Sequence, residues 1–391
     1  MSDEHPDDTR LATRPDDPGA VGEDASPPDE GFGPSGTIAG FDALLPANVL
    51  IVTGKGGVGK TTVAASLALA GVASGRRTLL VEVEGRQGFS RTFGTQPWDY
   101  TEREFRPGLW GAAVDPAEAV SEYLELFYGL KRIQWMMERS NVLDFVTTTA
   151  PGLRDLLLIG KIYEIETRKR ADGRRAYDLI VVDAPPTGRI VPFLQAPEGV
   201  TEIVRVGPIK RQAARIKEML TNPRRVQAVI VTLLEEMPVR ETGEGARALR
   251  EAGVAIDAII ANQAEIPRLD AAAAARVVGD GASALRDAAA AAGATMSGRT
   301  AELTVDLVDA HADRMAMQDD LRRSLELGGG APVLALPLLT GASFGADELT
   351  VLADVLALQA GEAGPAAEAA LHPATLASLD GSWRPYAAVR S

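Results

Sequence analysis

The stretch Gly54-Lys55-Gly56-Gly57-Val58-Gly59-Lys60-Thr61-Thr62 decides the fold of this chain. An apolar run at 49–52 precedes it, and a helix-like run at 63–70 follows it. A strand, a glycine-rich loop and a helix in this order, with the spacing glycine, four residues, glycine, lysine, threonine, are typical of a phosphate-binding P-loop. The alternative, a glycine-rich turn with incidental lysines, does not account for the two flanking elements. We therefore predict a nucleotide site here.

The residue types of this loop suit a triphosphate bound together with Mg²⁺. The four glycines lack a Cβ, so they can reach positive φ and let the backbone approach a ligand closely. The loop N–H groups and the positive end of the following helix then form a nest for phosphate oxygens. Lys60 supplies a full charge for the β- and γ-phosphates, and the Thr61 hydroxyl suits a Mg²⁺ that keeps most of its water. The predicted nucleotide contacts in the loop are Gly54, Lys55, Gly56, Gly57, Val58, Gly59, Lys60, Thr61 and Thr62.

A carboxylate ends another apolar run, at 177–183, where the last residue is Asp183. A continuous apolar run is typical of a buried parallel strand. The carboxyl ends of such strands line the ligand crevice of α/β proteins. Asp183 is therefore placed to hold a water molecule of the Mg²⁺. The alternative is a strand-ending aspartate that caps the next turn.

Strand-like and helix-like runs alternate along most of the chain. Further strands are predicted at about 78–83, 110–115, 226–233, 254–261 and 333–337. Helices are predicted at about 60–74, 116–139, 153–169 and 271–292. Apolar strands that alternate with helices imply a parallel sheet covered on both faces. The predicted fold class is an α/β P-loop NTPase with a mostly parallel sheet, helices on both faces and a small helical insert.

The composition changes at both ends of the chain. Residues 1–40 hold ten acidic residues and two arginines, so they contribute 2 − 10 = −8 to a net charge of −14. High charge with low hydrophobicity is typical of disorder. We predict a disordered acidic tail at 1–42, which is a solubilising appendage or, alternatively, a partner-binding arm. The P-loop domain is expected at 43–360 and a loosely ordered tail at 361–391.

The overall composition excludes several classes of function. The chain has no cysteine among its 391 residues, which excludes disulfides, thiolate metal sites and a cysteine nucleophile. The net charge of −14 argues against bulk binding to nucleic acid. No apolar run approaches the roughly 20 residues that span a bilayer. We expect a cytoplasmic protein without a nucleic-acid partner.

Lys55, directly after the first glycine, is not needed in an ordinary P-loop. With it, the loop resembles the deviant P-loop of dimeric ATPases, among them septum-site and partition ATPases, nitrogenase iron protein, and the arsenite-pump and tail-anchored-protein-targeting ATPases. The segment Asp-Ala-Pro-Pro-Thr-Gly-Arg at 183–189 resembles the switch II motif of the last two, with Arg189 where they have histidine. The resemblance is strongest to an actinobacterial branch of arsenite-ATPase-like proteins.

The resemblance implies roles for single residues. Lys55 is expected to reach across a dimer interface to the partner's nucleotide; the alternative is an exposed loop lysine. Glu84 matches a switch I aspartate that orients the attacking water, or it is an ordinary solvated glutamate. Asn262 matches an asparagine that contacts adenine. Glu241 and Glu235 match two glutamates at the dimer interface, or they are surface carboxylates.

As a whole, the resemblance implies a Mg²⁺-dependent ATPase of the arsenite-pump family that binds ATP between two subunits. The expected catalytic residues are Lys55, Lys60, Glu84 and Asp183, the expected metal ligands are Thr61 and, through water, Asp183, and Asn262 and Glu241 join the loop as nucleotide contacts. The partner subunit is a second copy or a paralogous ATPase, and hydrolysis drives a membrane or client protein through a conformational change. The alternative is a weakly hydrolysing regulatory subunit of a heterodimer with a paralogous ATPase. Trivalent arsenic prefers thiolates, so the lack of cysteine argues against direct arsenite binding.

Overall fold

The computed structural model describes residues 46–83, 87–115, 118–119, 122, 151–203, 207–339 and 344–361. These residues belong to one compact unit of the chain. Several predictions lie outside the described residues, namely the tail at 1–42, Glu84, nearly all of the helix at 116–139, and the tail at 361–391 apart from its first residue.

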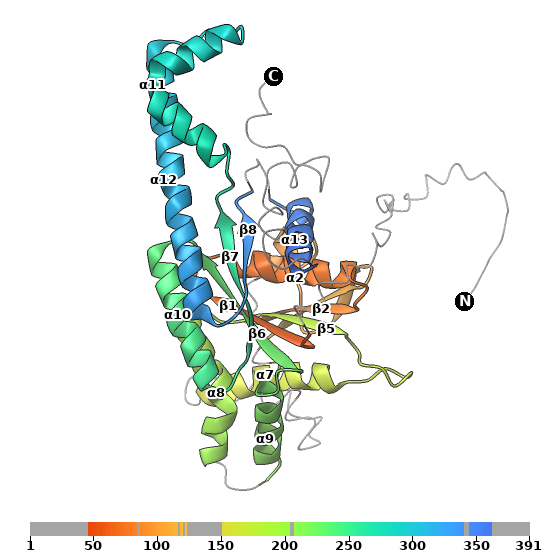
Figure 1. Ribbon diagram of the computed structural model, residues 1–391. Coiled ribbons are helices and arrows are strands. Elements are labelled where there is room, and N and C mark those ends of the chain that lie inside the picture. Colours follow the sequence, from red (N-terminus) through yellow and green to blue (C-terminus); the bar gives the residue numbers. More distant parts are fainter. Residues whose placement is uncertain are drawn as a thin grey trace, which may run out of the picture. The chain divides into compact units, whose positions relative to one another are not determined.

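The described residues form an eight-stranded sheet in the order β3-β4-β2-β5-β1-β6-β7-β8. Figure 1 labels these strands except β3 and β4. The strands are β1 (Val49–Gly54), β2 (Thr78–Val83), β3 (Arg103–Arg106), β4 (Leu109–Val114), β5 (Leu179–Asp183), β6 (Val226–Leu233), β7 (Ile256–Ala264) and β8 (Val333–Pro337). All neighbouring strands are parallel except β3 and β4, which are antiparallel. The predicted fold class is therefore confirmed.

Helices cover the sheet on both faces. The helices of the described residues are α2 (Lys60–Ala73), α3 (Gly88–Phe93), α7 (Pro151–Thr167), α8 (Thr187–Ile203), α9 (Pro208–Leu220), α10 (Glu236–Glu251), α11 (Ala271–Ala291), α12 (Gly298–Gly329) and α13 (Ala346–Gly361). Helices α2 and α13 lie side by side on one face (Figure 1), and α7, α8, α9 and α10 cover the other.

Two hydrophobic cores explain why the central strands are apolar at most positions. In β1, Val49 and Ile51 point into the core under α7 to α10. Leu50 and Val52 point into the core under α2 and α13. Successive side chains of a strand face opposite sides of the sheet, so a strand covered on both faces buries all of them. The resulting sheet holds the carboxyl ends of β1, β2, β5, β6 and β7 along one edge, where the candidate site lies.

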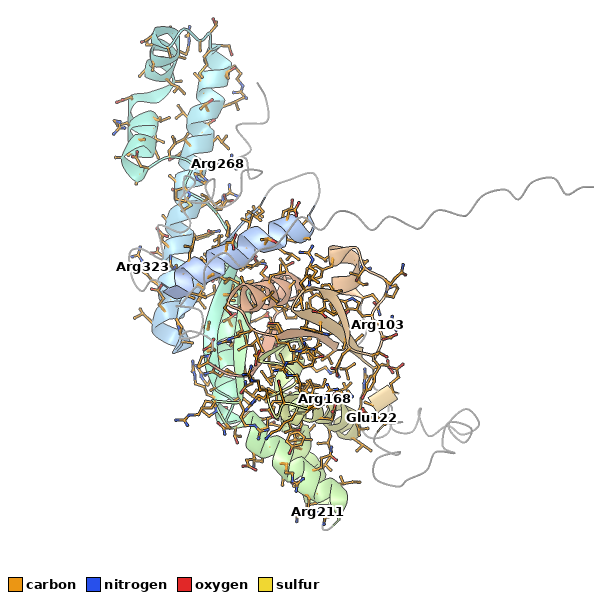
Figure 2. The ribbon with its side chains drawn as sticks, turned by 90° about the vertical axis from the view of Figure 1, so that its right-hand side faces the viewer. Arg103, Glu122, Arg168, Arg211, Arg268 and Arg323 are labelled. Atoms are coloured by element: carbon orange, nitrogen blue, oxygen red, sulfur yellow. The ribbon has the colours of Figure 1, made fainter. Side chains whose placement is uncertain are left out.

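The predicted strand at 110–115 is β4, but the sequence does not predict the neighbouring strand β3. Its sequence, Arg-Glu-Phe-Arg, is mostly charged and only partly buried. Arg103 of this strand is labelled in Figure 2. Charged residues are common on edge strands, where they discourage pairing with other chains. An edge strand of this kind lacks the apolar pattern by which the central strands are found.

Helix α11 confirms the helix predicted at 271–292, with a break at Gly281, whose φ is 76°. None of the residues of α11 is buried, and the helix packs on α12. Helix α12 in turn contacts α10, β7 and β8. In the part of the chain that the structure describes, no helix combines the length and the apolar character needed to cross a bilayer.

Candidate functional site

Three glycines of the segment from the end of β1 to the start of α2 have positive φ, the backbone region that favours glycine. Gly57 and Gly59 have φ of 88° and 89°, and Gly54 has φ of 152°. A Cβ on Gly54 would lie 2.2 Å from the carbonyl oxygen of Val231 on the adjacent β6, so only glycine fits there. Gly56 is different, since it has no positive φ and a Cβ on it would meet nothing within 4 Å. Gly56 therefore does not use, in this structure, the positive φ that is open to a glycine.

Lys60 and Asn262 brace this loop from two sides. Lys60 is 8 % exposed, and its Nζ donates a hydrogen bond of 3.1 Å to the carbonyl oxygen of Lys55. Asn262, at the carboxyl end of β7, is 4 % exposed, and its Nδ2 donates to the carbonyl oxygen of Val58 at 2.9 Å. Gly59 packs directly on this amide, because a Cβ there would lie 2.2 Å from Nδ2. The predicted adenine contact of Asn262 stays a prediction, and its visible contact is with the loop.

Thr61 and Asp183 meet as the two predicted metal ligands. The Thr61 hydroxyl, on the first turn of α2, donates to Oδ2 of Asp183 at 2.7 Å. Asp183 ends β5, which pairs in parallel with β1. A hydroxyl and a carboxylate are hard oxygen donors of the kind that Mg²⁺ prefers, usually with several waters retained. The residues present therefore fit a Mg²⁺ bound by Thr61 and, through water, by Asp183.

Lys55 and Glu241, predicted separately, form an ion pair within one chain. The Nζ of Lys55 lies 2.7 Å from Oε1 of Glu241, on the second turn of α10. The side chains are 38 % and 34 % exposed, so the pair lies at the surface. In this structure Lys55 is turned toward its own helix α10. Its action on a partner's nucleotide is not seen and stays a prediction.

The segment after β5 is tied to both β1 and α7. The buried Thr53 hydroxyl donates to the carbonyl oxygen of Pro185 at 2.7 Å. Arg189, on the first turn of α8, places Nη2 3.1 Å from Oδ1 of Asp155 on α7, and Asp155 is 7 % exposed. The segment that resembles switch II is therefore connected to the helical face of the sheet opposite α2.

Glu82 is a residue of this site that the sequence does not predict. It lies on β2, is 2 % exposed, and its Oε1 accepts a hydrogen bond of 2.9 Å from the backbone N–H of Gly88. In the pairing of β2 with β5, Glu82 is directly opposite Asp183. An acidic residue in the otherwise apolar run Thr-Leu-Leu-Val-Glu-Val was the available signal.

A buried carboxylate also lies away from the loop, near the start of β7. Asp257 is 9 % exposed, and burial raises its pKa from 3.8 to about 7. It lies five residues before Asn262 on the same strand, near the opposite edge of the sheet. Asp257 therefore affects the stability of the fold and is not part of the candidate site.

Comparisons with known proteins find similarity to proteins described as ATPases. Residues 47–213 match the sequence family described as anion-transporting ATPase. The chain is 42 % identical over 234 residues to the ATPase BagA of Mycobacterium tuberculosis, covering 58 % of this chain and 68 % of that protein. It is 25 % identical to the ATPase GET3 of Kluyveromyces lactis, over 55 % of this chain and 71 % of that protein. It is 27 % identical to the arsenical pump-driving ATPase of Acidiphilium multivorum, over 54 % of this chain and 39 % of that protein.

Proposed function

This chain belongs to the anion-transporting ATPase family, and from that premise we propose that it is a Mg²⁺-dependent ATP hydrolase that works as a dimer. The observation that supports this most directly is the assembled loop. Its left-handed glycines, the buried Lys60 and the contact of Thr61 with Asp183 lie together at the carboxyl edge of the sheet. Residue types, spacing and geometry all suit a triphosphate.

The chain's own groups have distinct tasks in this proposal. The loop N–H groups and the start of α2 bind the phosphate oxygens. Lys60 exchanges the carbonyl oxygen of Lys55 for the β- and γ-phosphates, which replaces a neutral acceptor by a charged one. Thr61 and Asp183 hold the Mg²⁺, which when bound neutralises the charge that develops on the phosphates. Glu84, outside the described residues, is proposed to orient the attacking water.

The proposed dimer completes the charge around the γ-phosphate. Lys55 leaves Glu241 and reaches the nucleotide of the partner subunit, which is a second copy or a paralogous ATPase. A cation supplied across an interface in this way is an effective stabiliser of phosphoryl transfer. Lys55 belongs to the phosphate-binding loop itself. The loop that binds the nucleotide of one subunit therefore also positions the lysine that acts on the nucleotide of the partner subunit.

We propose that ATP hydrolysis drives a membrane or client protein, and that the segment after Asp183 transmits the conformational change. That segment contacts β1 through Thr53 and α7 through Arg189. Loss of the γ-phosphate would change the position of the segment, and the ion pair of Arg189 with Asp155 would pass this change to α7. Loops that contact the phosphates can become ordered, become disordered or move when the nucleotide is hydrolysed, and such changes are a known way to alter the binding of a partner protein.

The test is phosphate release by the purified full-length chain with ATP and Mg²⁺. We expect Lys60→Ala to lower ATP affinity by at least about 100-fold, because one charge-assisted contact to phosphate is worth roughly 3 kcal/mol. The matched control is Lys169→Ala, an exposed lysine distant from the loop, which should bind ATP like the wild type. Equal ATP binding by Lys60→Ala and the wild type would overturn the proposal.

The same assay separates the two subunit arrangements. Turnover by the chain alone, with a rate per subunit that rises with protein concentration, supports a homodimer. ATP binding without turnover, followed by turnover when a paralogous ATPase is added, supports the regulatory subunit of a heterodimer instead.

A further inference from the structure

Strand β2 buries one carboxylate, although the other five side chains of the strand are those of threonine, leucine and valine. Its sequence is Thr-Leu-Leu-Val-Glu-Val, and all six residues are buried. Glu82 is 2 % exposed. A buried carboxylate is unfavourable unless hydrogen bonds or an opposite charge compensate it. The residues around Glu82 in the sheet therefore bear on its role.

Glu82 and Asp183 face each other on neighbouring parallel strands, about 4.8 Å apart in the hydrogen-bonding direction. Both lie on the sheet face that α2 covers, since Leu80 and Val181, two residues before them, belong to the core under α2. Like charges directly opposite on one face destabilise a sheet. A cation between these carboxylates would remove that repulsion.

Thr61 and Gly88 close the space around the two carboxylates. The Thr61 hydroxyl donates to Asp183 at 2.7 Å. A Cβ on Gly88 would lie 3.0 Å from Cγ2 of Thr61 and 3.7 Å from Oε1 of Glu82, so Glu82 and Thr61 approach the same point from two sides. The predicted metal ligands Thr61 and Asp183 therefore have Glu82 as an immediate neighbour.

The hydrogen bond from Gly88 to Glu82 suggests a simpler role, namely fixing the first residue of α3. A glutamine in this position could accept the same bond, because its side-chain carbonyl is an equivalent acceptor. A structural role therefore requires an oxygen at this place but not a negative charge. The two roles differ in what removal of the charge alone would do.

We propose that Glu82 is a second carboxylate of the magnesium site, which holds the water shell of the cation together with Asp183. This inference rests on the proposed function, because the metal enters with the nucleotide. Mg²⁺ keeps several waters in protein sites, and carboxylates that hold such ligands set the affinity of the metal. Since Glu82 also accepts a hydrogen bond from the backbone N–H of Gly88, the same side chain connects the metal site to the start of α3.

The experiment measures the binding of Mn²⁺, a paramagnetic substitute for Mg²⁺, to the full-length chain with saturating ADP. We expect Glu82→Gln to weaken Mn²⁺ binding by at least about 10-fold, the usual effect of losing a group that supports a metal ligand. ADP affinity in EDTA should stay within about 2-fold of the wild type, because the phosphate-binding loop is intact. Glu82→Asp keeps the charge and should retain most of the Mn²⁺ affinity.

Glu104→Gln is the matched control. Glu104 also accepts a hydrogen bond of 2.9 Å from a glycine N–H, that of Gly108, but it lies on the edge strand β3. This variant should bind Mn²⁺ like the wild type. A second readout is thermal unfolding with and without Mg²⁺ and ADP, where Glu82→Gln should lose most of the metal-dependent rise in Tm.

Two results overturn the inference in distinguishable ways. Unchanged Mn²⁺ affinity of Glu82→Gln would show that Glu82 only fixes α3, through the hydrogen bond from Gly88 that glutamine retains, and the proposed function would stand. A wild-type chain that binds no ADP would overturn the proposed function and this inference together.

Discussion

Replacing Glu241 by glutamine should strengthen ATP-dependent dimerisation, although it removes an ion pair. Lys55 now pairs with Glu241 of its own chain at 2.7 Å. In the proposed dimer Lys55 acts on the partner's nucleotide, so this pair must open first. Glu241→Gln keeps the size and the hydrogen-bonding capacity of the side chain and removes only the charge that holds Lys55 back.

The size of the effect follows from the exposure of the pair. With side chains 38 % and 34 % exposed, solvent screens the attraction, and a pair of this kind contributes about 0.2–1 kcal/mol. A symmetric dimer opens two such pairs, which amounts to about 0.4–2 kcal/mol. Because about 1.4 kcal/mol corresponds to a factor of ten, the dimer Kd should fall by about 2- to 30-fold. High salt should reduce the difference, since it screens exposed charges.

The assay is sedimentation velocity over a range of protein concentrations with Mg²⁺ and a slowly hydrolysed ATP analogue. Glu244→Gln is the control, because Glu244 pairs with Arg240 at 3.3 Å on the same helix and is more exposed. Lys55→Ala should abolish the nucleotide-dependent dimer. Weaker dimerisation of Glu241→Gln would refute the reasoning, because it would mean that the Glu241 carboxylate makes a favourable contact in the dimer, as the sequence resemblance implies.

Two further predictions concern the fold and its coupling. Burial raises the pKa of Asp257 to about 7 from 3.8, so the stabilising contribution of its protonated form is complete below about pH 4 and is lost as pH rises through 7. At pH 8, Asp257→Asn should therefore raise the free energy of unfolding by a few kcal/mol relative to the wild type, which is measured as a higher urea midpoint. This difference should narrow toward pH 5, and an equal difference at both pH values would contradict the prediction. Arg189→Ala should lower stability by about 1 kcal/mol, since Arg189 is 40 % exposed but Asp155 is buried. A double-mutant cycle with Asp155→Asn measures the coupling energy, and independent effects of the two changes would exclude a direct link.

The parts of the fold that the sequence predicts are those whose signal is local. The glycine-rich loop needs its residue types within nine consecutive positions, 54–62. The central strands are apolar because both of their faces are covered. Strand β3 escapes prediction because it is charged and lies at the edge of the sheet. Helices are expected between the strands predicted at 254–261 and 333–337, but the bounds of α12 are not predicted, because it buries only Ala301, Leu325 and Gly329 in its 32 residues and has no continuous apolar stripe.

The contacts of the site are harder to predict, because its residues are distant in sequence. Lys55 and Glu241 are separated by 186 residues, and Thr61 and Asp183 by 122. Each residue of these pairs carries a recognisable role by itself. Which residues meet depends on the order of the strands, since β1 lies between β5 and β6 although both come later in the chain.

Asn262 illustrates how a resemblance can supply a residue and leave its contact open. The resemblance assigns it to adenine, whereas the structure shows its Nδ2 on the carbonyl oxygen of Val58. Gly59 makes this possible, because any Cβ there would collide with the amide. Glycine at 59 therefore serves both the left-handed backbone of the loop and the approach of β7 to it. A residue that braces the phosphate loop can still sense the base through its remaining carbonyl oxygen, so the two roles are compatible. The brace requires only the amide nitrogen, and therefore an aspartate at 262 would lose it while keeping the shape of the side chain.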